Sequence, residues 1–231
     1  MSAAAGRYDA VLFDLDDTLL DHRGAANDAL HGWAEHVSLR MPVDELVATW
    51  QVLERRYYDR YQRGELTKTE QRRARLRELL APRTLSDDVA DRLFAGYWQR
   101  YRAAWRLFPD AEAAVSRAVA ARLRIGVLTN GDAADQRRKV AATALAGYAL
   151  PVFASSELPA AKPDPRAFAF ACSALAVTSD RCLMVGDSLV NDVDGALAAG
   201  LPAVLLDRHG GADAAGTTFP VIGSLDELQF R

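Results

Sequence analysis

Residues 10–18 read AVLFDLDDT, an apolar run that ends abruptly in a cluster of carboxylates. A short, uninterrupted apolar run is typical of a strand that is buried on both faces of a parallel sheet. Such a strand carries the residues that follow it to one edge of the sheet. This stretch therefore predicts an α/β protein with Asp14, Asp16 and Asp17 at the carboxyl end of its first strand.

Three more apolar runs have the same form and end in turn residues. They cover residues 124–128, 182–185 and 203–206. Because stretches with helical spacing accompany them, the pattern predicts a doubly wound, Rossmann-like parallel sheet with helices on both faces. Sheets of this kind bind ligands beyond the carboxyl ends of their strands.

Residues 21–108 contain no strand pattern and show helical spacing instead. The helical stretches are 25–38, 43–63, 68–81 and 87–104. All four tryptophans and five of the seven tyrosines of the chain lie in this segment. We therefore predict two domains, an α/β core formed by residues 1–20 and 109–231 and an inserted four-helix bundle formed by residues 21–108.

The composition is that of an ordinary globular protein. Of 231 residues, 50% are hydrophobic and 26% are charged, and the formal net charge is -3. This balance gives no electrostatic drive toward nucleic acid polymers or anionic membranes, so we expect a small-molecule partner. No apolar stretch approaches the length of a membrane span and the first residues lack a signal-peptide pattern, so we expect a cytoplasmic protein. The sequence leaves monomer and homodimer open.

The carboxylates after the first strand repel one another, and a bound cation is the simplest explanation of their proximity on an apolar element. Mg²⁺ prefers carboxylate and carbonyl oxygens and keeps several waters, so Asp14 and Asp16 need only one further carboxylate. Asp187 can supply it, because it follows another apolar run and a glycine. Asp192 is a further metal candidate, although Asn191 and Asp192 can also open the next helix as a cap.

Two further segments offer groups that bind anions. Thr129-Asn130-Gly131 provides a hydroxyl, a side-chain amide and backbone N–H groups at the start of a helix. Lys162 is one of only three lysines against 25 arginines, so this position selects a compact ammonium over a guanidinium. A metal, carboxylates, a hydroxyl and an ammonium on one edge of a sheet indicate a site for phosphoryl transfer.

These segments, in this order, resemble the four motifs of the haloacid dehalogenase superfamily of hydrolases. Asp14-x-Asp16-x-Thr18 is similar to the first motif, Thr129 with Asn130 to the second, Lys162 to the third, and Gly186-Asp187-x-x-x-x-Asp192 to the fourth. The resemblance spans the chain. A helical insertion directly after the first motif is similar to the type-one cap of subfamily I.

The resemblance implies a phosphatase that works through an aspartyl-phosphate intermediate. Asp14 would be the nucleophile, and Asp16 would protonate the leaving group and then activate water as a base. Lys162 would offset negative charge on the nucleophile and the phosphate, which gives it a catalytic and a substrate-binding role. Thr129 and the backbone of Asn130 would hold the phosphoryl oxygens.

The resemblance also implies one Mg²⁺ ion as cofactor. Its ligands would be the Asp14 carboxylate, the Asp16 main-chain carbonyl and Asp187, with Asp192 as an additional acidic neighbour. The substrate would be a small soluble phosphomonoester, such as a nucleotide, a sugar phosphate or an organic-acid phosphate, and the insertion would open to admit it and close over it. Side chains that could contact the substrate or its leaving group are His22, Arg23, Trp33, Arg55, Tyr58, Tyr61 and Trp98.

Three alternatives stay open. A 2-haloacid dehalogenase shares the fold and the nucleophile, but the resemblance implies that it lacks the acid that this chain has in Asp16. A phosphoglucomutase-like transferase keeps both Asp14 and Asp16. A non-enzymatic phosphometabolite-binding module on the same fold is the third alternative, which the complete set of reacting groups disfavours.

Overall fold

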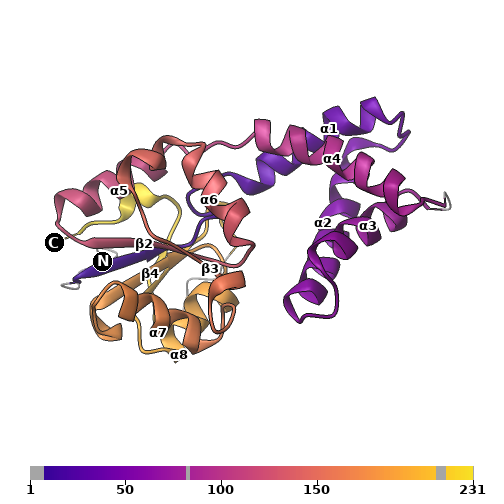
Figure 1. The fold of residues 1–231 in the computed structure, drawn as a ribbon. Helices are drawn as coiled ribbons and strands as arrows, with labels where there is room; N and C mark the ends of the chain where they lie inside the picture. The colour runs from indigo at the N-terminus through magenta and orange to yellow at the C-terminus, as the bar shows by residue number, and fades with distance from the viewer. Residues whose placement is uncertain (1–7, 82–83, 212–216, 231) are drawn as a thin grey trace. The chain divides into compact units, whose positions relative to one another are not determined.

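The computed structural model describes residues 8–81, 84–211 and 217–230, and the chain divides into two compact units. One unit consists of Met1–His22 with Arg106–Arg231 and contains the sheet, and the other consists of Arg23–Trp105 and is helical. Figure 1 shows the elements of each unit. Among the described residues, no helix combines the length and the apolar character that crossing a membrane requires.

The first unit is built on a six-stranded sheet in which all neighbouring strands are parallel. The strands are β1 (Ala10–Phe13), β2 (Arg124–Thr129), β3 (Val152–Ala154), β4 (Cys182–Gly186), β5 (Ala203–Leu206) and β6 (Val221–Ile222). They lie in the order β3-β2-β1-β4-β5-β6. This arrangement confirms the predicted doubly wound α/β fold. Strands β3 and β6, which the sequence did not reveal, are the two short outer strands.

Helices cover both faces of the sheet. Figure 1 shows α5 (Ala111–Ala120) and α6 (Ala133–Ala141) over one face, and α7 (Pro165–Ala174) and α8 (Gly195–Ala198) over the other. The core beneath α7 includes Phe168, which is fully buried in a cluster with Leu12 and Leu128. Short segments of 3-10 or π-helix join these elements: η1 (Ala144–Tyr148), η2 (Ser155–Glu157), η3 (Ser179–Arg181), η4 (Leu189–Asp194) and η5 (Leu225–Glu227).

Strand β1 lies between β2 and β4, and this position brings the sequence motifs together. Phe13 at the end of β1 pairs with Val127 on one side and with Val185 on the other. The residues that follow, Asp14 after β1 and Asp187 after β4, therefore reach the same edge as the end of β2. The strand order reverses at this point, where open α/β sheets bind their ligands.

The chain leaves the first unit and returns to it through two paired segments. Leu20 forms an isolated antiparallel bridge with Leu107. Next to it, the Phe108 N–H donates to the Leu19 carbonyl at 2.9 Å. The insertion therefore begins and ends at neighbouring points of the first unit.

The described residues of the insertion form four helices: α1 (His22–His36), α2 (Val43–Gln62), α3 (Lys68–Leu79) and α4 (Asp87–Ala103). Helix α3 begins with a capping box in which Thr67 and Glu70 satisfy each other's backbone N–H groups. Helix α4 begins at Ser86, whose hydroxyl accepts the Val89 N–H at 3.4 Å. Polar N-caps of this kind define where α3 and α4 begin, because they satisfy backbone N–H groups that have no partner within the helix.

The helical unit has an aromatic core. Trp33 and Trp50 are each 1% exposed, and the indole N–H of Trp33 donates to the Leu93 carbonyl at 2.9 Å. Trp33 is therefore a core residue of the helical unit. The expectation that it contacts a substrate is wrong, because its side chain is buried within this unit. Trp98 is half-buried against the same core. The other aromatic and basic candidates of the insertion are more open: Tyr58 and Tyr61 are half-buried, and Arg23 and Arg55 are exposed.

Candidate active site

A buried ion-pair cluster around Lys162 lies at the carboxyl edge of the sheet. Its Nζ is 2.7 Å from Asp14 Oδ1 and 2.6 Å from Asp192 Oδ1. All three residues are buried. Burial alone would lower the pKa of Lys162, but the two carboxylates raise it above its ordinary value. Lys162 therefore stays positively charged and offsets part of the negative charge around it.

Asp187 completes the acidic side of this cluster. Asp14, Asp187 and Asp192 each offer a carboxylate oxygen, and these oxygens lie within 4.8 Å of one another. Burial, with repulsion from Asp192 and Asp17, raises the pKa of Asp187 to about 7. Burial also raises the pKa of Asp14 well above its usual value, against the attraction of Lys162. Because one ammonium does not balance three carboxylates, the donor set fits a divalent cation such as Mg²⁺.

Asp192 anchors Lys162 and is not the N-cap residue of the helical segment that contains it. The cap of η4 is Ser188, whose Oγ accepts the Asn191 N–H at 3.2 Å, and Asp192 lies inside that segment. The second oxygen of Asp192 accepts the Ser188 N–H at 3.0 Å. Gly186 makes room for this carboxylate, since a Cβ at Gly186 would lie 2.2 Å from Asp192 Oδ2. The alternative that Asp192 only opens the next helix is therefore wrong.

Asp16 pairs with a different group of polar side chains, which come from α6. Lys139 Nζ lies 2.7 Å from each carboxylate oxygen of Asp16. The Gln136 amide donates to Asp16 Oδ2 at 2.9 Å and to Thr129 Oγ1 at 2.6 Å. Burial would raise the pKa of Asp16, but Lys139, His22 and Gln136 lower it below its usual value. Lys139 and Gln136 therefore hold the Asp16 carboxyl group next to Thr129.

Gln136 and Lys139 were not identified from the sequence. They are three residues apart on α6, so they share one face of the helix. The sequence of α6 also contains two arginines and resembles that of an ordinary exposed helix, so nothing in it marked Gln136 and Lys139 as site residues. The available signal was the rarity of lysine, because Lys139 is one of three in the chain and the reasoning applied to Lys162 applies equally to it.

Asn130 contacts the backbone of Lys162. Its Nδ2 donates to the Lys162 carbonyl at 2.8 Å, and the Lys162 N–H donates to its Oδ1 at 2.9 Å. The amide side chain expected to face a phosphate therefore holds the segment that carries the ammonium. Thr129 and Asn130 both lie at the end of β2, and both side chains are engaged by other site residues.

A second network ties the first motif to the fourth. The Asp187 N–H donates to Thr18 Oγ1 at 3.1 Å. Arg208 donates to the Thr18 carbonyl at 2.9 Å and makes two contacts of 2.9 Å with Asp110. Its guanidinium lies 3.9 Å from the centroid of the Phe108 ring. Arg208 thereby fixes the loop after β1 against the segment that returns from the insertion.

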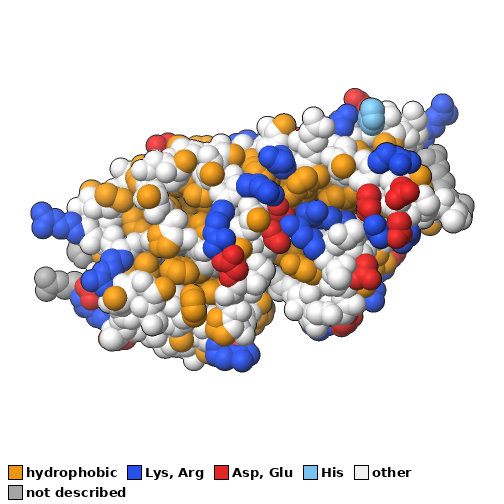
Figure 2. Space-filling model, in the orientation of Figure 1, with side chains coloured by type: hydrophobic (Ala, Val, Ile, Leu, Met, Phe, Trp, Pro, Cys, Tyr) orange, Lys and Arg blue, Asp and Glu red, His pale blue; other side chains and the backbone are white. Residues whose placement is uncertain are grey.

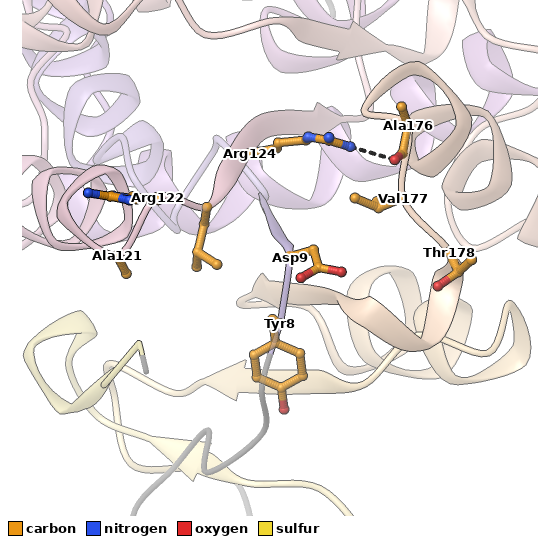
Figure 3. A pocket seen from close by; sticks show the side chains of 9 residues that line it. Tyr8, Asp9, Ala121, Arg122, Arg124, Ala176, Val177 and Thr178 are labelled. Atoms are coloured by element: carbon orange, nitrogen blue, oxygen red, sulfur yellow. Dashed lines mark hydrogen bonds between the residues drawn. The ribbon is translucent and has the colours of Figure 1, made fainter.

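A separate cavity of about 590 Å³ lies at the opposite edge of the sheet, where β1 and β2 begin (Figure 3). It is lined by Tyr8, Asp9, Ala121, Arg122, Leu123, Arg124, Ala176, Val177 and Thr178. Arg124 donates to the carbonyls of Leu175 and Ala176, and Asp9 pairs with Arg181 at 2.8 Å. Because these partners already use the charges of Arg124 and Asp9, we assign the candidate active site to the carboxyl edge.

Figure 2 shows basic and acidic side chains interspersed on the face that it draws.

Comparison with known proteins places this geometry in a family. A family model described as haloacid dehalogenase-like hydrolase matches residues 8–200. Phosphoglycolate phosphatase of Rhodospirillum rubrum is 31% identical over 202 residues, which cover 85% of this chain and 78% of that protein. Phosphoserine phosphatase of Thermus thermophilus is 40% identical over 109 residues, covering 47% of this chain and 44% of that protein. The chain therefore matches less than half the length of this second relative.

Solved structures share the fold over nearly the whole chain. The magnesium-bound hydrolase YfnB of Bacillus subtilis has a TM-score of 0.79 and 22% identity, over 96% of this chain and 97% of that chain. A 2-haloacid dehalogenase of Pseudomonas syringae pv. Tomato has a TM-score of 0.66 and 27% identity, over 95% of this chain and 96% of that chain. The fold alone does not distinguish the reactions of such proteins. The family match, together with motif segments that meet at one sheet edge, confirms the resemblance seen in the sequence: the chain belongs to the haloacid dehalogenase-like hydrolase family.

Proposed function

We propose that this protein is a Mg²⁺-dependent phosphatase that hydrolyses a small phosphomonoester through an aspartyl-phosphate on Asp14. The observation that supports this is the buried juxtaposition of Asp14, Lys162 and Asp187 at the point where the strand order reverses. Asp16, two residues beyond the nucleophile, adds a group that can move a proton. A phosphate arriving at this edge would meet an ammonium and a cation site beside the nucleophile.

Asp14, Asp187 and the main-chain carbonyl of Asp16 would hold Mg²⁺, with Asp192 beside them as the residue that also holds Lys162. When bound, Mg²⁺ would offset the repulsion between an anionic nucleophile and an anionic phosphate. The raised pKa values of Asp14 and Asp187 support this assignment. Carboxyl groups that resist ionisation through crowding ionise readily when a cation neutralises them.

In the first step, a carboxylate oxygen of Asp14 bonds to phosphorus while the bond between phosphorus and the ester oxygen breaks. Asp16 gives a proton to that oxygen, so the alcohol leaves uncharged. Lys162 and Thr129, with the backbone of Asn130, balance the charge on the phosphoryl oxygens. In the second step, Asp16 removes a proton from water, whose oxygen attacks phosphorus and releases phosphate from Asp14.

Asp16 also favours a phosphatase over a 2-haloacid dehalogenase. A dehalogenase forms its ester at carbon and needs no acid at this position, whereas Asp16 is held beside Thr129 by two side chains of α6. The 31% identity to a phosphoglycolate phosphatase over most of the chain favours the same reaction. A phosphoglucomutase-like transferase would use the same groups, and product analysis separates it, because a transferase moves the phosphoryl group to a second hydroxyl.

We extend the proposal to the helical unit and the substrate. Arg23–Trp105 would act as a cap that closes over the site and excludes water that is not positioned to react. The substrate class is a nucleotide, a sugar phosphate or an organic-acid phosphate. The protein would act in the cytoplasm, as a monomer or a homodimer.

The test is a hydrolysis screen of the purified protein with nucleotides, sugar phosphates and organic-acid phosphates, each in Mg²⁺ and in EDTA. We expect release of inorganic phosphate from at least one class in Mg²⁺ and none in EDTA. Asp14→Asn should lower kcat by roughly 1000-fold or more, as expected for loss of a nucleophile. Equal turnover in EDTA would contradict the metal requirement, and retained activity in Asp14→Asn would contradict the nucleophile.

A further inference from the structure

We propose that Lys139 and Gln136 are positioning residues for Asp16, which aim its carboxyl group at the leaving-group oxygen of the substrate. This inference rests on the proposed function, because it assigns a task to two side chains around the proposed acid and base. It adds to the four sequence motifs a fifth element, one face of helix α6.

The contacts fix both the position and the plane of the Asp16 carboxylate. Lys139 Nζ is 2.7 Å from each oxygen and so is shared equally between them. Gln136 donates to one oxygen only, at 2.9 Å, which sets the rotation about the bond to that group. Together these three hydrogen bonds restrict the orientation of the carboxylate. A proton-transfer group needs such a fixed approach, since transfer occurs over about 2.6–3.2 Å.

Gln136 also couples Asp16 to the phosphate-binding side of the site. The same Nε2 that donates to Asp16 donates to Thr129 Oγ1 at 2.6 Å. Thr129 is the last residue of β2, next to β1, and is 1% exposed. Because the Gln136 amide bridges these two oxygens, it fixes the distance between the Asp16 carboxyl group and the Thr129 hydroxyl, which is proposed to bind the phosphoryl group. Pre-organisation of this kind lowers the entropic cost of reaching the reactive geometry.

Anchoring of α6 does not require Lys139. The first turn of the helix is already held by Asp132, whose side chain accepts the Asp135 N–H, and by Ser156, which accepts the Ala133 N–H at 2.9 Å. A lysine side chain that is only 6% exposed is costly to bury. The side chain of the neighbouring Arg138 is 58% exposed and pairs with Asp135. The buried ammonium, unlike the Arg138 guanidinium, contacts both carboxylate oxygens of Asp16.

The test compares leaving groups. Protonation by Asp16 matters for an alkyl phosphate, whose alkoxide is a poor leaving group, and matters little for p-nitrophenyl phosphate, whose phenolate leaves readily. The value of kcat/KM reports the phosphoryl-transfer step for both. We expect Lys139→Met to lower kcat/KM about 30-fold for the best alkyl phosphate of the screen but less than about threefold for p-nitrophenyl phosphate, because Asp16 is no longer held within proton-transfer distance of the leaving-group oxygen.

Two comparisons make this result specific. Arg138→Met, on the same helix, should leave both substrates unchanged, and inhibition by inorganic phosphate should be the same in Lys139→Met as in the unmodified protein. Asp16→Ala should show the same selective loss, and adding Lys139→Met to Asp16→Ala should cost nothing more, because both changes remove one function.

Equal loss for both substrates in Lys139→Met, with a selective loss in Asp16→Ala, would overturn this inference and leave the proposed function standing. An equal loss in Asp16→Ala itself would overturn the acid role of Asp16 and the inference with it. If thermal melting shows that Lys139→Met does not fold, Gln136→Leu decides in its place. That variant keeps the lysine and should show the same selectivity with a smaller magnitude.

Discussion

The side chain of Asn130 is joined to the backbone of Lys162 by two hydrogen bonds, one in each direction, at 2.8 and 2.9 Å. Asn130→Ala removes both. We expect the free energy of unfolding to fall by about 2 kcal/mol, at about 1 kcal/mol per hydrogen bond. We also expect kcat to fall on the order of 100-fold, because the ammonium is no longer held in place.

Urea denaturation and hydrolysis kinetics measure these two effects of Asn130→Ala. The control is Asn27→Ala in helix α1, where we expect neither quantity to fall. An unchanged kcat in Asn130→Ala would show that Lys162 needs no support from this side chain.

Gly186 and Asp192 are so close that no larger residue fits at position 186. In Gly186→Ala the new Cβ would lie 2.2 Å from Asp192 Oδ2, so the carboxylate must move away from Lys162. We expect a loss of about 1–3 kcal/mol in unfolding free energy, as for other overpacked sites. Gly147→Ala is the matched control, because nothing lies within 4 Å of its Cβ position. Equal stability of the two variants would contradict this prediction.

Arg208 and Arg166 each make a two-point contact with an aspartate, but only the first is buried. Arg208 and Asp110 have side chains 13% and 8% exposed, against 68% and 34% for Arg166 and Asp164. We expect Arg208→Met to lower the free energy of unfolding by about 3 kcal/mol, because it leaves a buried carboxylate without its cation. Arg166→Met should change stability little, since exposed ion pairs contribute little. Thermal and urea denaturation of both variants check this contrast.

The raised pKa of Asp187 predicts a pH dependence of stability in metal-free protein. The group titrates near 3.8 when unfolded and at about 7 when folded, so the folded protein binds more protons between these values. The stability that this group contributes is therefore complete below its unfolded pKa and is lost as the pH rises through about 7. Asp187→Asn cannot ionise and avoids that loss.

We expect metal-free Asp187→Asn to exceed the unmodified protein in unfolding free energy by about 1–2 kcal/mol at about pH 8, with the difference vanishing near pH 4. Urea titrations in EDTA at both pH values measure it. Asp180→Asn, at an exposed carboxylate, serves as the control. A constant difference between Asp187→Asn and the unmodified protein at all pH values would show that crowding of Asp187 is not its cause.

With Mg²⁺ bound, the unmodified protein should be more stable than Asp187→Asn, which is the reverse of the order in metal-free protein. An ion that binds only the folded state stabilises it by RT ln(1 + [Mg²⁺]/Kd). We therefore expect saturating Mg²⁺ at neutral pH to raise the Tm of the unmodified protein, and to leave that of Asp187→Asn nearly unchanged. Differential scanning calorimetry with and without EDTA measures the shift. Equal shifts in both proteins would place the ion elsewhere.

The strands that could be predicted from the sequence are those whose own residues form an apolar run. β1, β4 and β5 are unbroken apolar runs with every residue buried, and β2 has one exposed residue at its start. β3 and β6 have three and two residues, too few to form a pattern. They exist because β2 and β5 offer open edges for pairing, as in the register of Leu205 with Val221.

The sequence allowed us to predict which motif residues meet at the site, but not which other side chains contact them. Residues that follow parallel neighbouring strands must meet at one edge, so the approach of Asp14 and Asp187 follows from the strand assignment alone. The partner of Asp16 does not follow from it, because Lys139 is 123 residues away and reaches Asp16 only through the face that α6 turns to the sheet. No spacing within the sequence specifies that face.

The bridge between Leu20 and Leu107 means that the polypeptide departs and returns at adjacent positions. Antiparallel partners of this kind have Cα atoms about 5 Å apart, a gap that a tight two-residue turn closes. Protein engineers can therefore excise the intervening helices and seal the remaining chain with a minimal loop. The same position suits the insertion of another domain whose own N- and C-termini lie close together.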